Sequence, residues 1–301
     1  MSAPPSLSIL VPVYNYGVEP LVRALSAQCV ALSLDHEIRV YDDGSAPLWA
    51  SANQGVQELP GVTYQVLGQN IGRSRIRNLM AKDARKDLLL FLDCDSGIPT
   101  ADFIAAYMAQ ADAAVVVGGT LYAPGPPVDV QHRLHWKVGK AREERKASQR
   151  ATSPYRSITL NNILVAKAAF LHVLLDESIR TYGHEDTKFG QQLKEQGITI
   201  RHIDNPVVHN GLSTNTEFLA KTREAQRNLY RLYATGCYGT GTGVVRTYRQ
   251  LARLGMTSVF TAGYRLMQPL VERMLLAGTA PLFFFDVYKL YHFIRNEQAP
   301  A

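Results

Sequence analysis

The chain has 301 residues, of which 46% are hydrophobic and 19% are charged. This composition is typical of a folded protein with a sizeable core and excludes a disordered chain. A membrane-spanning helix needs about 20 mostly apolar residues. The best stretch, residues 274–285, is shorter and contains Gly278 and Pro281, so we expect no membrane span.

The three cysteines, Cys29, Cys94 and Cys237, are odd in number and widely spaced. This pattern favours neither a disulfide framework nor a zinc site. A polar lead at residues 1–6 runs directly into an apolar strand without a signal-peptide pattern, so we expect a cytoplasmic protein. The net charge of +6 favours anionic partners, namely nucleic acid, acidic lipid or phosphate-bearing substrates, without choosing among them.

The first half of the chain alternates strand and helix patterns. Buried strands are predicted at residues 7–13, 37–42, 62–67, 88–92 and 114–117. Helices are predicted at residues 20–32, 48–59, 73–82 and 101–111. Such alternation predicts an α/β fold with a mostly parallel sheet covered by helices on both faces. Ligands of these sheets bind beyond the carboxyl ends of the strands, so the polar residues that follow each strand are the candidate site residues.

The second half has a different pattern from about Tyr122 onward. We expect a basic helical stretch at 132–150, a strand at 159–165, a helix at 185–196 and a short strand at 199–203. An amphipathic helix is predicted at 217–233, and two or three more at 244–293. No internal repeat is present in the sequence.

Two carboxylates follow the apolar run at 88–92. Asp93 and Asp95 flank Cys94, so a backbone turn after the strand would let both reach one cation. Mg²⁺ and Mn²⁺ favour oxygen ligands and share them with substrate diphosphates. The alternative is a pair of exposed turn aspartates, because an Asp-x-Asp sequence alone is a weak signal. The buried strand before it favours the metal site.

Two further clusters follow predicted strands. Asp42-Asp43-Gly44-Ser45 ends the second strand, where Asp43 would accept a hydrogen bond from a nucleobase; the alternative is simple turn chemistry. Asn70-Ile71-Gly72 leads into a helix that carries Arg73, Arg75 and Arg77. A helix amino terminus with arginines favours phosphate, although a solvated helix face explains Arg73 and Arg75 equally well.

Glu185 and Asp186 stand in the first turn of another predicted helix, and His184 precedes them. Acidic residues in this position commonly serve only to start a helix. The functional interpretation is a general base, which must be a carboxylate close to the reacting atoms.

Together these clusters resemble the family 2 glycosyltransferases with the GT-A fold. The matching motifs are Val-Pro-Val-Tyr-Asn at 11–15, Asp-Asp-Gly-Ser at 42–45, Gln-Asn-Ile-Gly at 69–72 with Arg-Asn at 77–78, Asp-x-Asp at 93–95 and Glu-Asp-x-x-Phe at 185–189. They occur in the family order over residues 7–211. Ile76 replaces the usual alanine, and Lys188 stands where many members have a third acid.

The resemblance implies a role for each site residue. Pro12, Val13, Tyr14, Asn15, Asp43, Asn70, Gly72, Arg77, Asp93 and Cys94 would bind the donor nucleotide, with Tyr14 against the base. Asp95, Asp93 and His209 would bind Mn²⁺ or Mg²⁺. Asp186 would be the general base, with Glu185 as the second candidate.

The resemblance also implies domains and partners. Residues 1–215 would form the GT-A domain, with a nucleotide-sugar half at 1–121 and an acceptor half at 122–215, and residues 216–301 a helical extension. The enzyme would invert the anomeric carbon of a UDP-sugar and pass the sugar to a saccharide or lipid-linked saccharide in cell-surface polysaccharide or glycolipid synthesis. No nucleic-acid partner is expected.

Three other functions are alternatives to glycosyl transfer. A sugar-phosphate nucleotidylyltransferase is the main alternative, but no glycine-rich, arginine-containing loop follows the first strand. A dinucleotide-dependent oxidoreductase is disfavoured because the glycines at 239–243 lack the Gly-x-Gly-x-x-Gly spacing. A nucleic-acid binder is disfavoured because no reader motif is present.

Two basic segments lie outside these motifs. Residues 137–150 carry Lys137, Lys140, Arg142, Arg145, Lys146 and Arg150, and we expect a mobile helix that binds an anionic or lipid-diphosphate acceptor, or else a solvated helix. Residues 244–295 contain seven basic and two acidic side chains among apolar ones. This pattern predicts either binding to an anionic membrane on its cytoplasmic face, without crossing it, or packing, including a homodimer.

Overall fold

The computed structural model describes residues 5–236, 239 and 241–297; Cys237 and Thr240 therefore lie outside the described residues. The chain divides into two compact units, each described by itself. The first unit comprises the chain up to Tyr122 together with Glu143–Arg180 and Phe189–Gly211. The second comprises Ala123–Arg142, Thr181–Lys188 and the chain from Leu212 onward. The functional domain boundary predicted at residue 215 stays a prediction.

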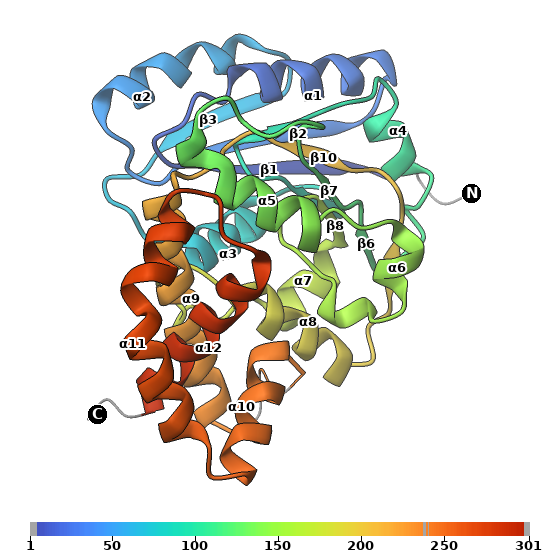
Figure 1. Cartoon of the computed structure of the whole chain (residues 1–301). Coiled ribbons are helices and arrows are strands. Elements are labelled where there is room, and N and C mark those ends of the chain that lie inside the picture. The colour runs from blue at the N-terminus through green and yellow to red at the C-terminus, as the bar shows by residue number, and fades with distance from the viewer. Residues whose placement is uncertain (1–4, 237–238, 240, 298–301) are drawn as a thin grey trace. The chain divides into compact units, whose positions relative to one another are not determined.

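The first unit is built on a seven-stranded sheet (Figure 1). Its strands, in spatial order, are β3 (Val62–Val66), β2 (His36–Asp42), β1 (Leu7–Val13), β4 (Leu88–Phe91), β8 (Ile163–Ala166), β6 (Val115–Val117) and β9 (Ile200–His202). β3, β2, β1 and β4 run parallel, whereas β8 is antiparallel to both of its neighbours. The predicted α/β class with a mostly parallel sheet is confirmed.

Helices cover both faces of this sheet (Figure 1). One face packs on α1 (Glu19–Ala31), the 3₁₀ turn η1 (Gln54–Glu58) and α4 (Phe103–Met108). The other packs on α3 (Arg73–Asp83), α7 (Lys167–Val173) and the later part of α8 (Glu185–Glu195). Helix α2 (Pro47–Asn53) follows β2. The central strands β1, β4, β8 and β6 are buried on both faces, which explains their nearly continuous apolar sequences.

A second, three-stranded sheet in the same unit was not predicted. It has the order β5 (Ser96–Gly97), β10 (Val207–His209), β7 (Thr120–Leu121). Its strands have two or three residues each, too few for an alternating pattern to appear in the sequence. The sheet matters because it carries a predicted site residue, His209.

The predicted strand at 159–165 begins later than expected. Asn162 has a left-handed backbone with φ 64°, and the strand β8 starts only at Ile163. The Asn162 side chain is fully buried and accepts from the Tyr107 hydroxyl at 2.6 Å. Its amide donates to the carbonyls of Gly119 and Asn205, both at 2.8 Å. These bonds hold the unusual backbone in place, since a buried polar group needs partners.

The predicted basic helix at 132–150 is interrupted. It forms α5 (Arg133–Arg142) in the second unit, and α6 (Ala147–Ala151) with the turn η3 (Pro154–Arg156) in the first. Arg150 does not belong to a solvated basic surface, because its side chain is only 5% exposed. Lys137 donates to the carbonyl of Ala280 at 2.7 Å, and Arg142 pairs with Asp286 at 2.6 Å. Lys137, Arg142 and Arg150 thus serve internal contacts.

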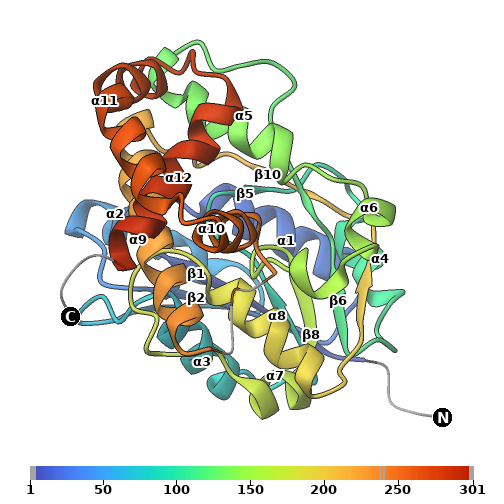
Figure 2. The same cartoon turned by 60° about the horizontal axis from the view of Figure 1, so that its bottom comes forward.

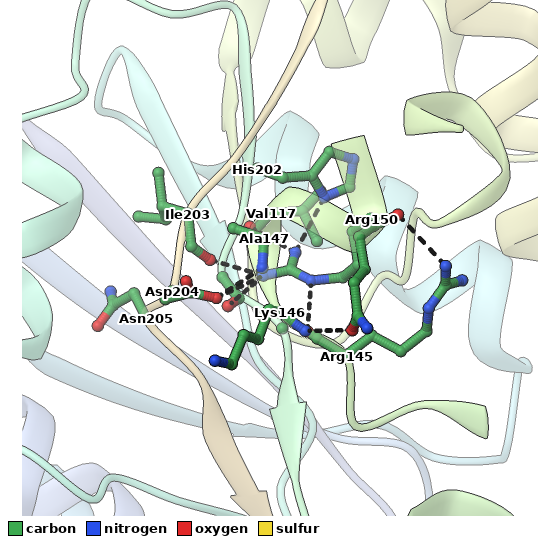
Figure 3. Close-up of polar contacts among 12 residues, drawn as sticks. Val117, Arg145, Lys146, Ala147, Arg150, His202, Ile203, Asp204 and Asn205 are labelled. Atoms are coloured by element: carbon green, nitrogen blue, oxygen red, sulfur yellow. Dashed lines mark hydrogen bonds and ion pairs between the residues drawn. The ribbon is translucent and has the colours of Figure 1, made fainter. Parts of the chain in front are cut away.

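The Arg150 guanidinium is surrounded by acceptors from distant segments (Figure 3). It donates to the carbonyls of Arg145, Val117, Gly118 and Ile203 at 2.6–3.1 Å. It also bonds His202 Nδ1 at 2.9 Å. Burial and the Arg150 charge lower the pKa of His202, so its ring is neutral and accepts this bond. Arg150 therefore joins α6 to the ends of β6 and β9.

Replacing Arg150 by methionine is expected to lower the free energy of unfolding by about 3 kcal/mol. Methionine fills much of the space but leaves several carbonyls without their donor, and buried unsatisfied groups are costly. The exposed Arg156, changed to methionine, should have an effect of at most about 0.5 kcal/mol. Chemical denaturation of both variants measures the difference; equal stability would contradict the role of Arg150.

The second unit is helical, with α5, α9 (Asn215–Ala234), α10 (Gly243–Arg253), α11 (Thr257–Leu276) and α12 (Leu282–Glu297). Helix α12 packs against α9, α10 and α11 (Figures 1 and 2). Its core contains stacked rings, such as Tyr264 on Tyr291 with centroids 4.1 Å apart. Among the described residues, no helix has the length and apolarity needed to cross a membrane.

Candidate active site

The predicted donor residues lie at one edge of the large sheet. Val13 at the end of β1 pairs in register with Asp42 at the end of β2, and Leu10 pairs with Phe91 at the end of β4. Because these three strands are parallel and adjacent, the polar segments that follow them meet at this edge.

The segment after β1 is fixed by the segment after β2. Asn15 has a left-handed backbone with φ 50°, and its N–H donates to Ser45 Oγ at 2.8 Å. Its side chain accepts from the N–H of Ala46 at 2.8 Å. Asn15 thus holds the segment after β1 against the segment after β2. The side chain of the preceding residue, Tyr14, is 53% exposed. Pro12 and Val13 belong to the strand itself.

The two aspartates after β2 have different environments. Asp42 is fully buried, accepts from the N–H of Ser45 at 2.7 Å and from the Tyr64 hydroxyl at 2.8 Å, and closes the turn. Asp43 accepts from the N–H groups of Ile71 and Gly72 at 2.7 and 3.1 Å. Burial raises the pKa of Asp43, and these two amides oppose the rise. Asp43 therefore links the β2 turn to the start of α3.

Glycine is required in this turn. Gly44 has φ +75°, and a Cβ there would lie 2.8 Å from the backbone nitrogen of Asn70. Residues 69–72 therefore lie directly against the turn at residues 42–45, and these two proposed donor motifs are neighbours. Gly72, with φ +89°, immediately precedes α3.

The arginines of α3 point to different partners. Arg77 is 2% exposed; it bonds Asp93 Oδ1, and Arg73 approaches Asp93 Oδ2 at 3.6 Å. Arg75 instead lies 3.7 Å from Glu177, beside an open cavity of about 340 Å³. Ile76, the departure from the family pattern, is buried in the core against the sheet and does not line this surface.

The charges around Asp93 favour its ionised form. Burial alone would raise the pKa of Asp93, but Arg77 and Arg73 outweigh it and the pKa is lowered. The backbone N–H of Asp93 donates to Asn161 Oδ1 at 3.0 Å, and Ser96 Oγ donates to the same oxygen at 2.9 Å. Asn161 was not predicted as a site residue, because it stands in a stretch predicted as a strand and belongs to none of the recognised motifs.

Asp95 and His209 are brought together by the small sheet. His209 on β10 pairs with Ser96 on β5, directly after Asp95. His209 Nδ1 lies 3.6 Å from Asp95 Oδ1, an oxygen that is buried and has no hydrogen-bond partner among the described residues. Burial raises the pKa of Asp95, His209 opposes the rise and the charge of Asp93 adds to it.

The surroundings of this pair leave little space. A Cβ on Gly211 would lie 2.1 Å from Asp95 Oδ2, so only glycine fits there. The ring of Tyr122 stands 5.5 Å from that of His209 between centroids. Burial, followed by the charge of Asp95, raises the pKa of Tyr16. The thiol of Cys94 has a pKa raised to about 12 by burial and by both aspartates, so it is not a thiolate.

Asp95 and His209 offer two protein ligands to a divalent cation. In the part of the chain that the structure describes, no group of three or more His, Cys, Asp or Glu side chains is arranged around one metal position. Asp95 and His209 nevertheless offer an oxygen and a ring nitrogen close together, and the unbonded Asp95 oxygen is buried. Mg²⁺ and Mn²⁺ commonly take one or two protein ligands and complete their shell with phosphates and water. The pair therefore fits such an ion, whereas Asp93 is engaged by arginines.

The two candidate bases belong to the second unit and open α8. Glu185 is 5% exposed and Asp186 is half-buried. His184, with φ 71°, bonds Thr187 Oγ1 through Nδ1 at 3.1 Å, and burial lowers its pKa to about 4.

The loop before these residues is held by α9. The Asn228 amide donates to the carbonyls of Thr181, Tyr182 and Gly183 at 3.1–3.3 Å. A Cβ on Gly183, which has φ +100°, would lie 2.6 Å from Ala225 Cβ. The start of α8 is thus fixed to α9 within the second unit.

The chain matches the model of a known protein family. The model described as Glycosyl transferase family 2 matches residues 8–167, more than half of the chain. It covers every donor residue named above except His209, whose position comes from the small sheet.

Individual relatives are more distant. The chain is 24% identical over 237 residues to a chondroitin synthase of Escherichia coli. That alignment covers 67% of this chain and 34% of that protein, so the chain spans about a third of its length.

Solved structures share the fold. A mannosyltransferase, PcManGT of Pyrobaculum calidifontis, in complex with GDP-Man and Mn²⁺, has a TM-score of 0.58 at 14% identity, over 98% of this chain and 88% of that one. S. aureus TarS 1-349 in complex with UDP-GlcNAc has a TM-score of 0.51 at 15% identity, over 97% and 90% of the two chains.

Proposed function

Because this chain belongs to glycosyl transferase family 2 and is a nucleotide-sugar glycosyltransferase, we propose that it transfers a sugar from a UDP-sugar with inversion at the anomeric carbon. The observation that carries the proposal is the meeting of Asp93, Arg77, Asp95 and His209 at the carboxyl edge of the sheet. A sugar-phosphate nucleotidylyltransferase is not supported by the family to which the chain belongs.

The donor nucleotide is assigned to the segments after β1, β2 and β4. Tyr14, exposed by 53%, offers a ring face for the base. Asp43 still has acceptor capacity after its two backbone bonds, since a carboxylate accepts about four, and would accept from the imide of uracil. Asp93, ionised and held by Arg77, would accept from the ribose hydroxyls. Asn70, Gly72 and Cys94 are assigned to the same donor-binding region.

The diphosphate is assigned to the Asp95–His209 pair and to Arg73. Asp95 and His209 would hold Mn²⁺ or Mg²⁺, which when bound neutralises charge on the departing diphosphate. Arg73, 42% exposed at the first turn of α3, supplies positive charge from the protein itself. Two relatives of the same fold were solved with a nucleotide sugar, one of them with Mn²⁺, which supports this assignment.

The acceptor is activated by a carboxylate. Asp186 takes the proton of the acceptor hydroxyl while its oxygen attacks the anomeric carbon from the face opposite the diphosphate. The bond between that carbon and the diphosphate breaks in the same step, and the configuration inverts. Asp186 is preferred to Glu185 because it is half-buried, whereas Glu185 is 5% exposed and less able to meet an acceptor.

The acceptor is proposed to be a saccharide or a lipid-linked saccharide in cell-surface polysaccharide or glycolipid synthesis. The support is the relative named chondroitin synthase, a third of whose length this chain spans. This relative supports a saccharide as the class of acceptor.

A donor screen tests the proposal. With Mn²⁺ present, the protein is expected to release nucleoside diphosphate from at least one UDP-sugar faster than from dTDP- or GDP-sugars. Release from none of the three donor classes would contradict the assigned donor site. A preference for GDP-sugars would keep the transfer chemistry and overturn the uracil contact of Asp43.

A further inference from the structure

Helix α11 has one face that packs and one that does not. Tyr264, Val271 and Leu275 are at most 4% exposed and join the core of the second unit, where Tyr264 stacks on Tyr291 of α12. Figures 1 and 2 show α11 lying along α12. Helix α11 therefore packs into the core of the second unit through the face that carries Tyr264, Val271 and Leu275.

The opposite face of α11 is apolar and exposed. Val259, Leu266 and Leu270 are 66%, 86% and 57% exposed. Their spacing of seven and four residues puts them on one side of the helix. Leu254 and Met256, in the connection from α10, are also exposed. Large apolar side chains that are exposed along one side of a helix are typical of a surface that binds a partner.

Arginines accompany these apolar side chains. Arg265 and Arg273 are exposed on α11, and Arg246, Arg249 and Arg253 are exposed along one side of α10. None of the five forms an ion pair with a residue that the structure describes. The single acid between residues 243 and 276 is Glu272, which accepts from Gln268 at 3.0 Å.

We propose that these side chains form one docking surface, the α10–α11 face, and that its partner is an anionic lipid bilayer. The face comprises Leu254, Val259, Leu266 and Leu270 with Arg246, Arg249, Arg253, Arg265 and Arg273. Apolar side chains enter the boundary between head groups and acyl chains, and arginines stay with the phosphates. Exposed basic residues at such a surface each add attraction to acidic lipids.

The positive charge of the α10–α11 face favours an anionic lipid over a second copy of the chain as the partner. A symmetric dimer through this face would bring five arginines against five, with Glu272 as the only acid of α10 and α11 to offset them. Anionic head groups supply the missing negative charge. The helices lie on the membrane surface in this arrangement.

Vesicle co-sedimentation tests the docking surface independently of transfer activity. The full chain is expected to pellet with phosphatidylglycerol-containing vesicles at low salt, and to remain in solution with pure phosphatidylcholine vesicles or at high salt. A protein that stays in solution with the anionic vesicles at low salt would overturn the proposal, as would binding that ignores both lipid charge and salt.

Variants locate the surface. The double variant Leu266→Ser, Leu270→Ser and the double variant Arg265→Glu, Arg273→Glu should each lower the partition coefficient by about tenfold or more. The matched controls are Leu48→Ser and the pair Lys194→Glu, Arg227→Glu, all exposed positions outside the face, and they should bind like the wild type. Controls that lose binding equally would overturn the assigned location.

Light scattering of the same proteins tests whether the α10–α11 face is instead a contact between two copies of the chain. The wild type and the Leu266→Ser, Leu270→Ser variant should have the same mass in solution and the same melting temperature. A wild-type dimer that this variant dissociates would identify the face as a contact between copies and overturn the lipid assignment.

Discussion

Replacing Asp186 by asparagine should lower kcat by about a hundredfold to ten-thousandfold, the usual contribution of a general base. Asparagine keeps the size of the side chain but cannot take the proton of the acceptor hydroxyl. The base acts on the acceptor alone, so the affinity for the nucleotide sugar should remain that of the wild type. Steady-state transfer rates and calorimetric titration with the donor measure the two quantities separately.

The neighbouring carboxylates are the controls for this prediction. Glu185→Gln should lose much less activity, and Glu195→Gln, exposed at the other end of α8, should lose none. A dead Glu185→Gln enzyme beside an active Asp186→Asn enzyme would move the role to Glu185. If both retain activity, the base lies elsewhere in the chain.

Changing Asp95 to asparagine should remove most of the transfer activity, by about a hundredfold or more, while the protein stays folded. Asp95 Oδ1 forms no hydrogen bond among the described residues, so the fold loses little. Burial and the nearby Asp93 raise the pKa of Asp95, which means that its charge is unfavourable without a cation. Loss of that charge should leave the melting temperature unchanged or slightly raised.

Metal removal checks the same assignment in the wild type. Excess EDTA should abolish transfer, and Mn²⁺ added in excess over the chelator should restore it. The control Asp102→Asn, an exposed aspartate before α4 that forms no capping bond, should keep full activity and metal response. Full transfer in EDTA would show that Asp95 serves no cation.

The clustering of the proposed donor motifs could be predicted from the sequence because these motifs follow parallel strands. β1 and β4 were visible as apolar runs and β2 as a strand that ends in Asp-Asp-Gly-Ser, and parallel neighbours bring their carboxyl ends to one edge. The helix α3 was predicted almost to the residue, and Arg77 was identified with it. Its bond to Asp93 depends on strand order, which periodicity does not reveal.

Other features could not be predicted for specific physical reasons. The approach of His209 to Asp95 depends on strands of two or three residues, too short to leave a pattern. Arg150 stands in a charged stretch that resembles a solvated helix, yet it is buried among backbone carbonyls. Asp43 was assigned to a nucleobase, and its bonds to the amides of Ile71 and Gly72 arise from a tertiary contact.

Calorimetric titration of UDP into the wild-type protein, with and without Mn²⁺, tests the assigned donor site most directly because it needs no acceptor. Binding should be strong with Mn²⁺ and much weaker in EDTA. The Asp95→Asn variant should lose the effect of the metal, and the Asp186→Asn variant should retain it. Binding of UDP that is equal with and without Mn²⁺, or a metal effect that survives in Asp95→Asn, would contradict the account.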